Sequence, residues 1–104
     1  MNEILDIQTD VADEKLPEHF FLSQNFPNPF NPATNINFTL TTQERVQLDV
    51  YNTIGERVVR LVDGDFVAGT HNIYFDASDL AGGVYLYRLV AGYKVESRKM
   101  ILLK

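Results

Sequence analysis

Residues 82–93 form the sequence Gly82-Gly83-Val84-Tyr85-Leu86-Tyr87-Arg88-Leu89-Val90-Ala91-Gly92-Tyr93, which contains the strongest strand signal in the chain. Tyr85, Tyr87 and Leu89 recur at a period of two, and such alternation is typical of a β-strand with one buried face. The turn at Gly92 is short, so the strand before it is predicted to form an antiparallel hairpin with residues 94–103.

Alternation of the same kind predicts further strands before this hairpin. They are expected at residues 34–40, 46–51, 58–62 and 71–76, with a short opening edge strand within residues 19–24. Turn residues separate them, among them Asp63-Gly64-Asp65, and the mixed apolar order of residues 58–62 indicates a bulge. Leu80, which precedes Tyr85 across two glycines, suggests a tyrosine corner. The sequence therefore predicts an all-β fold, an immunoglobulin-like antiparallel β-sandwich of about seven strands.

A proline-rich segment precedes most of these strands. We name it the proline strap, residues 25–32, and its sequence is Asn25-Phe26-Pro27-Asn28-Pro29-Phe30-Asn31-Pro32. The three prolines fix φ and remove backbone donors, which excludes a helix or a central strand, and a polyproline II path would place the asparagines along one edge. Phe26 and Phe30 are the expected anchors, so side chains rather than a hydrogen-bond ladder are predicted to hold the strap. By itself the segment also fits a stiff loop that leads into a β domain.

The net charge of −5 is concentrated at the start of the chain. Residues 1–18 contain six of the 14 acids and one of the nine bases, which leaves eight acids and eight bases in residues 19–104. We interpret residues 1–18 as an acidic linker and residues 19–104 as one folded domain. Because no basic stripe is present to neutralise phosphates, nucleic-acid binding is not expected.

The linker also lacks the features of a targeting or membrane segment. No apolar run in the chain approaches the roughly 18 residues of a spanning helix, so no membrane span is expected. Residues 1–18 have neither the basic start nor the apolar core of a signal peptide. If the domain is exported, its parent protein is expected to have that signal elsewhere.

The chain offers little for catalysis or for a cofactor, and we expect no enzyme. It has no cysteine, which excludes disulfides and thiolate metal sites, and no nucleophile is suggestively placed near His19 or His71. Four aspartates suggest a calcium site but also suit turn caps, namely Asp63, Asp65, Asp76 and Asp79. Four tyrosines suggest a sugar-stacking surface but also suit cross-strand packing, namely Tyr51, Tyr74, Tyr87 and Tyr93.

Three segments, taken in order, resemble a known export module. They are the proline strap, then Val50-Tyr51-Asn52-Thr53-Ile54-Gly55-Glu56-Arg57-Val58-Val59-Arg60-Leu61-Val62-Asp63-Gly64, then Leu80-Ala81-Gly82-Gly83-Val84-Tyr85-Leu86-Tyr87-Arg88-Leu89 continuing to Lys99-Met100-Ile101-Leu102-Leu103-Lys104. Over about residues 20–104 this set closely resembles the C-terminal sorting domain of the type IX secretion system, type A. It is also similar to the immunoglobulin-like domain of the flagellar hook-capping protein.

The resemblance implies a domain that is an address for export rather than a catalyst. A Sec signal would take a larger cargo, N-terminal to this domain in the same parent chain, into the periplasm, where the outer-membrane type IX translocon would recognise the domain. In many family members a sortase-like protease then removes the domain and joins the cargo to anionic lipopolysaccharide. The expected location is the periplasm in transit and then the cell surface or the secreted fraction, with cleavage expected in residues 1–18.

The resemblance also implies which residues the translocon would recognise. The matching positions are Pro27, Asn28, Pro29, Phe30, Asn31, Pro32, Gly55, Gly64, Gly83, Tyr85, Arg88, Lys99 and Lys104, the last of them where domains of this family also end. The closing strand adds Arg98 and Leu102, because a terminal strand can present its backbone to the sheet edge of a partner. Its apolar residues Ile101 and Leu103 are expected to pack inward, which leaves its basic residues for recognition.

A structural module is the alternative function. The same sandwich fits an immunoglobulin-like domain for adhesion, spacing or carbohydrate contact, and fold alone does not separate the two functions. A Sec signal in the parent and a C-terminal position of the domain would favour sorting, whereas an internal position would favour the structural role.

Overall fold

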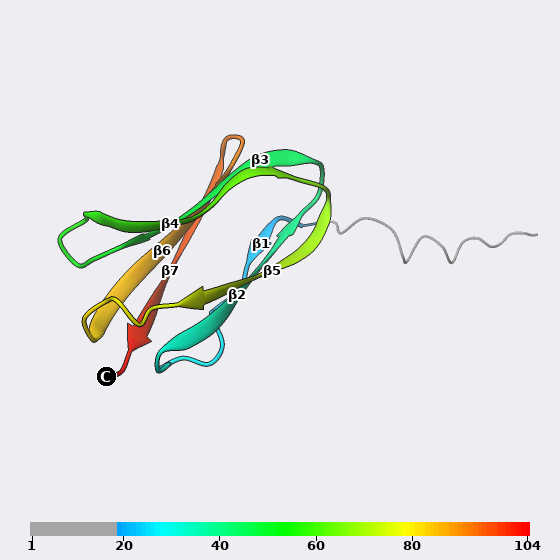
Figure 1. The fold of residues 1–104 in the computed structure, drawn as a ribbon. Coiled ribbons are helices and arrows are strands. Elements are labelled where there is room, and N and C mark those ends of the chain that lie inside the picture. Colours follow the sequence, from blue (N-terminus) through cyan, green and yellow to red (C-terminus); the bar gives the residue numbers. More distant parts are fainter. Residues whose placement is uncertain (1–18) are drawn as a thin grey trace, which may run out of the picture.

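The computed structural model describes residues 19–104, which contain seven strands and no helix. The strands are β1 (Phe21–Leu22), β2 (Ala33–Leu40), β3 (Glu44–Tyr51), β4 (Arg57–Phe66), β5 (Gly69–Asp76), β6 (Gly83–Ala91) and β7 (Lys94–Leu102). They form two antiparallel sheets, one in the order β1-β2-β5 and the other in the order β4-β3-β6-β7 (Figure 1). The predicted all-β antiparallel sandwich of about seven strands is confirmed, whereas the predicted linker at residues 1–18 lies outside the described residues.

The position of β4 distinguishes the strand order from that of a constant-type immunoglobulin domain. In the constant type, the fourth strand belongs to the sheet of the first, second and fifth strands. Here β4 pairs with β3 and lies at the edge of the four-stranded sheet. The closer relation to immunoglobulin domains stays a prediction.

The hairpin of β6 and β7 and the predicted tyrosine corner are both present. Ala91 lies opposite Lys94, and Gly92 in the turn has a φ of +63°, which glycine adopts without steric cost. At the start of β6 the Tyr85 hydroxyl donates a hydrogen bond of 2.6 Å to the Ala81 carbonyl. Leu80 packs against the core beside it. This bond fixes the loop before β6 to the strand itself.

The core lies between the sheets and is built from alternate strand residues. Its fully buried large side chains are Leu22, Phe30, Ile36, Phe38, Leu40, Val46, Leu48, Val50, Tyr87, Leu89, Met100 and Leu102. Burial of each such side chain contributes about 1.5–3 kcal/mol, so the alternation determines which face of each sheet turns inward. Tyr85, Tyr87 and Leu89 all face the core, as predicted.

β4 is longer than the sequence indicated. Asp63-Gly64-Asp65 was expected to end a strand, but these residues lie inside β4 and pair with β3. An edge strand tolerates them because one of its sides faces water, and Asp63 accepts a hydrogen bond of 2.8 Å from Arg45 on the neighbouring strand. The predicted bulge is confirmed, since the register of β3 against β4 shifts at Leu48/Asp49 and again at Val50/Tyr51.

Candidate functional site

The proline strap crosses from one sheet to the other. Its first half follows β2, where Phe26 and Asn35 exchange two main-chain hydrogen bonds of 3.0 Å. Its second half runs parallel to the end of β7, where the Phe30 N–H donates to Ile101 O at 3.0 Å and the Leu103 N–H donates to Phe30 O at 2.8 Å. The strap was expected to be held by side chains rather than by a hydrogen-bond ladder; two isolated main-chain bridges, at Phe26 and at Phe30, hold it as well. The strap and the C-terminal strand, far apart in the sequence, form one unit (Figure 1).

The two phenylalanines of the strap have opposite environments. Phe30 is 2% exposed and its ring lies 6.2 Å from that of Phe75, so it is an anchor as predicted. Phe26 is 79% exposed, which contradicts its predicted anchoring role. The asparagines do not share one edge either, because Asn25 is buried while Asn28 and Asn31 are exposed. The three X–Pro bonds of the strap are cis.

A buried polar cluster holds the start of the strap against β6. The Tyr87 hydroxyl donates to Ser23 O at 2.6 Å and accepts the Asn25 N–H at 2.7 Å. The Asn25 amide then donates to Pro27 O and to the Thr34 hydroxyl, both at 3.1 Å. Burial raises the pKa of Tyr87 to about 12, although the Asn25 N–H and the nearby Arg98 charge oppose the shift. The cluster satisfies its buried polar groups, so it has no free group for a ligand.

The inward residues at the end of β7 differ from those predicted. Met100 and Leu102 are buried, whereas Ile101 is half-buried and Leu103 is 51% exposed. The register of the hairpin decides this, because Met100 lies opposite the inward-facing Tyr85 and cross-strand partners share a face. Leu102, one of the predicted recognition residues, is thus part of the core.

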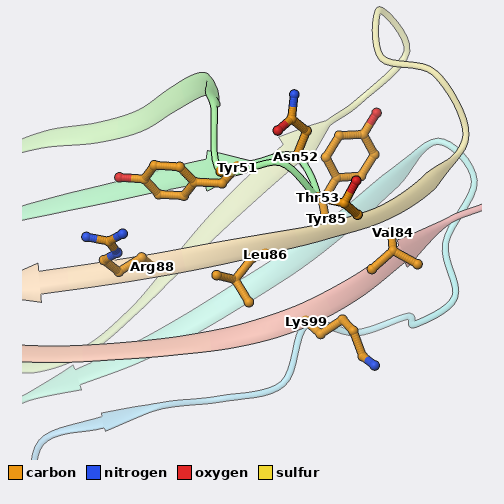
Figure 2. Close-up of a pocket in the computed structure, with 9 residues that line it drawn as sticks. Tyr51, Asn52, Thr53, Val84, Tyr85, Leu86, Arg88 and Lys99 are labelled. Atoms are coloured by element: carbon orange, nitrogen blue, oxygen red, sulfur yellow. The ribbon is translucent and has the colours of Figure 1, made fainter.

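Four other predicted recognition residues line a hollow in the four-stranded sheet: Gly55, Arg88 and Lys99, together with Tyr85, whose side chain otherwise belongs to the core. We name it the outer hollow; it has a volume of about 320 Å³, and its lining residues are Tyr51, Asn52, Thr53, Gly55, Val84, Tyr85, Leu86, Arg88 and Lys99 (Figure 2). The turn after β3 supplies Gly55 with a φ of +87°, and Asn52 Oδ1 holds that turn by accepting the N–H groups of Ile54 and Glu56. Strands β3, β6 and β7 supply the other sides.

Two cations border an apolar floor in the outer hollow. Val84 and Leu86, which are 42% and 39% exposed, form this floor. The Arg88 guanidinium lies 4.8 Å from the centre of the Tyr51 ring, a cation–π arrangement. Within residues 19–104, neither Arg88 nor Lys99 forms an ion pair. The hollow therefore suits a ligand that combines apolar groups with negative charge.

The remaining predicted residues lie elsewhere. Gly64 pairs with Val46 inside β4, and Arg98 lies on the opposite face of β7, where its Nε donates to Leu22 O at 2.6 Å. Lys104, just after β7, donates to the carbonyl of Ser78 in the loop between β5 and β6. Gly83 begins β6 next to the hollow. The strap meets the end of β7 at Phe30, and Asn28 Oδ1 accepts the Ile101 N–H there, but no strap residue lines the hollow.

Sequence reasoning missed Leu86 and the role of Tyr51. Tyr51 was considered only as part of a sugar-stacking surface, but Tyr87 is in the core and Tyr93 lies on the hairpin turn, so the four tyrosines do not share one surface. The alternation of β6 could have identified Leu86, because this apolar residue lies on the face of the strand opposite the core residues. Apolar residues on the solvent phase of a strand indicate a contact surface.

Of the four aspartates that suggested a calcium site, Asp63 forms ion pairs with Arg45 and Arg60, and Asp76 caps a turn. Asp76 accepts the Ser78 N–H at 2.9 Å and also its hydroxyl, and these bonds lower the pKa of Asp76. Residues 19–104 contain no cluster of three or more side chains suited to hold a metal ion. In the same part of the chain, no helix is long and apolar enough to cross a membrane.

Comparison with known protein families gives a match over most of the chain. A family model described as "Secretion system C-terminal sorting domain" matches residues 24–103, from the residue before the proline strap to the residue after β7. No curated protein matches the chain significantly.

Proposed function

Because this chain belongs to the secretion system C-terminal sorting domain family, we propose that the type IX translocon recognises it through the outer hollow. The domain is a C-terminal sorting signal for type IX secretion, a family that is not catalytic, and such a domain is part of a larger cargo protein that is exported to the cell surface or secreted. The structural-module alternative is disfavoured by this membership. What the family does not specify is the surface that the translocon contacts.

One observation supports the outer hollow most strongly. Gly55, Tyr85, Arg88 and Lys99, all named from the sequence as recognition residues, come from three separate segments and meet at this one place. The end of β7 is a weaker candidate for strand addition, because the strap already pairs with its edge at Ile101 and Leu103. Recognition through side chains on the outer face is therefore favoured over recognition through the strand edge.

The finer route of export is also a proposal. The cargo would reach the periplasm before it meets the translocon, and a sortase-like component would separate cargo from domain within residues 1–18. The cations and apolar side chains of the outer hollow would provide the contacts to the translocon, while the strap would keep the sandwich closed during transport.

The test is an export assay in a host with a type IX system. A reporter is fused in front of residues 1–104, and the double variant Arg88→Gln/Lys99→Gln is compared with the parent sequence. We expect the reporter of the double variant to be retained in the periplasm, because both charges that border the hollow are lost. Circular dichroism and thermal unfolding of the purified variants establish that the fold is intact.

The matched control is Arg45→Gln/Arg57→Gln. It removes two cations from the same sheet, but these already contact Asp63 and Asp49. This control should be exported like the parent. Normal surface delivery of the folded Arg88→Gln/Lys99→Gln variant would refute recognition through the outer hollow.

A further inference from the structure

The outer hollow has a chemistry that an acidic, partly apolar peptide complements. Val84 and Leu86 provide an exposed apolar floor, and Arg88 and Lys99 border it. Leu86 lies directly opposite Lys99 in the β6–β7 register, so an apolar side chain seated there would have a carboxylate-binding group beside it. An extended segment in which acids and apolar residues alternate would satisfy both features.

The cations on the neighbouring strands β3 and β4 already contact carboxylates: Arg45 contacts Asp63, and Arg57 and Arg60 contact Asp49. Arg60 binds both oxygens of the buried Asp49 carboxylate, at 2.8 and 3.1 Å, although Arg88 is the register partner of Asp49 on the other side. Arg88 is left to stack on Tyr51. Negative charge is therefore attracted to the hollow more than to the paired cations of β3 and β4.

The chain itself contains a segment of the complementary composition. Residues 3–7 are Glu3-Ile4-Leu5-Asp6-Ile7, two acids among three large apolar residues, and residues 1–18 contain six acids against one base. Residues 19–104 have equal numbers of acids and bases. The excess of acids thus lies in residues 1–18, whereas Arg88 and Lys99, which form no ion pair among the described residues, lie in the folded domain.

The chain enters the domain along β7. The Phe20 ring lies 5.5 Å from Lys94 Nζ, near the hairpin turn, and the chain then runs beside β7 towards Lys99. Leu22 O accepts the Arg98 Nε–H, and Gln24 donates from its amide to Lys99 O at 2.7 Å. The start of the domain therefore lies against the edge strand β7, whose residue Lys99 lines the hollow on the outer face. Residues 8–20 can span about 40 Å when extended, which is ample to pass around one edge strand.

We propose that residues 3–7 dock in the outer hollow of their own chain. The functional consequence of this docking rests on the proposed function. If the translocon recognises the outer hollow, the linker would cover that surface, and the translocon would have to displace it. A tethered segment of this length has an effective concentration in the millimolar range, so weak contacts to the two cations and the apolar floor are sufficient for partial occupancy. Linker and translocon would then compete for one surface.

The test uses the absence of cysteine from the natural sequence. The substitution Gln8→Cys places a single nitroxide label next to residues 3–7 in the full chain, and methyl NMR spectra report on paramagnetic broadening. At low salt we expect loss of the Val84 and Leu86 methyl signals, while the methyl signals of Val67, on the loop between β4 and β5, persist. The broadening should disappear in about 1 M NaCl, where the Debye length is about 3 Å.

Two variants sharpen the result. Arg88→Gln/Lys99→Gln in the labelled chain should restore the Val84 and Leu86 signals, whereas Arg45→Gln should not, because Arg45 is paired with Asp63. Unbroadened hollow methyls in the parent chain would overturn the proposal. So would broadening transferred to unlabelled, isotope-enriched chains in a mixed sample, which would show that a second copy supplies the segment.

The spectroscopic test and the export assay fail independently. If the hollow substitutions abolish export but the label never broadens Val84 or Leu86, recognition stands and docking of the linker is wrong. If the label broadens them but export is unaffected by the substitutions, docking stands and recognition through the hollow is wrong.

Discussion

The two faces of the four-stranded sheet differ in how completely their side chains find partners. On the inner face, Tyr87 is fully buried and its hydroxyl is bonded to Ser23 and Asn25. On the outer face, the next residue, Arg88, borders exposed apolar residues and has no ion pair among residues 19–104. Saturated contacts stabilise a fold, whereas unsaturated ones remain available to a partner. Substitutions on the inner face should therefore change stability, and those on the outer face should change export.

The largest effect is expected at the inner anchor of the strap. Phe30→Ala should lower the free energy of unfolding by about 3–5 kcal/mol, because it removes a buried ring at the junction of the strap, β7 and Phe75. Urea unfolding followed by circular dichroism measures the loss. Phe26→Ala is the matched control, since Phe26 is 79% exposed, and it should change stability by less than about 0.5 kcal/mol. Equal losses in the two variants would contradict the assignment of Phe30 as the anchor.

A smaller loss is expected at the polar cluster. Tyr87→Phe removes the hydroxyl that bonds Ser23 O and the Asn25 N–H, leaving both groups buried without that partner, and should cost about 1–3 kcal/mol. Tyr93→Phe, on the exposed hairpin turn, should cost almost nothing. The same urea titration compares them, and a neutral Tyr87→Phe would show that water replaces the hydroxyl without loss.

The pH dependence of stability provides a second measurement on Tyr87. Its pKa in the folded state is raised from 10.0 to about 12, so the folded protein keeps the proton more tightly than the unfolded chain. The corresponding stabilisation is fully present below pH 10 and is lost as the pH rises towards 12. The parent protein should lose this contribution over that interval, and the Tyr87→Phe variant should lack it.

The inner face of the four-stranded sheet was easier to predict from the sequence than the outer face. Alternation placed Tyr85, Tyr87 and Leu89 on one face of their strand, because a period of two is a local property of one strand. The structure shows that this face is the buried one. The prediction that Ile101 and Leu103 face inward was wrong. The hairpin register and the pairing with the strap determine which residues of β7 face the core. Local patterns do not contain such long-range pairings.

The outer hollow shows the same limit. Gly55, Tyr85, Arg88 and Lys99 were named by resemblance to a family, but nothing in the sequence indicated that they are neighbours. Their proximity depends on β3 and β7 flanking β6, which is a property of the sheet order. For the same reason Phe26 and Phe30 looked equivalent until the strap was seen to change sheets between them.

The smallest effect on stability, with a large effect on export, is expected from Leu86→Glu. The new carboxylate would lie opposite Lys99 and two residues before Arg88 on the same face of β6. It would therefore neutralise the positive charge of the hollow. A cross-strand pair of opposite charge contributes about 0.2–1 kcal/mol, which roughly offsets the loss of a half-exposed leucine. Stability should thus be nearly unchanged while surface delivery of a fused reporter falls.

Leu86→Gln is the matched control for this substitution, because it removes the same apolar surface without adding charge. If the outer hollow binds an acidic partner, the glutamate variant should be exported several-fold less than the glutamine variant, as measured by the ratio of surface to periplasmic reporter. If apolar contact alone mattered, the two variants would be equally impaired. If both were exported like the parent, the outer face would have no role in export, and the difference between the two faces would have no functional consequence.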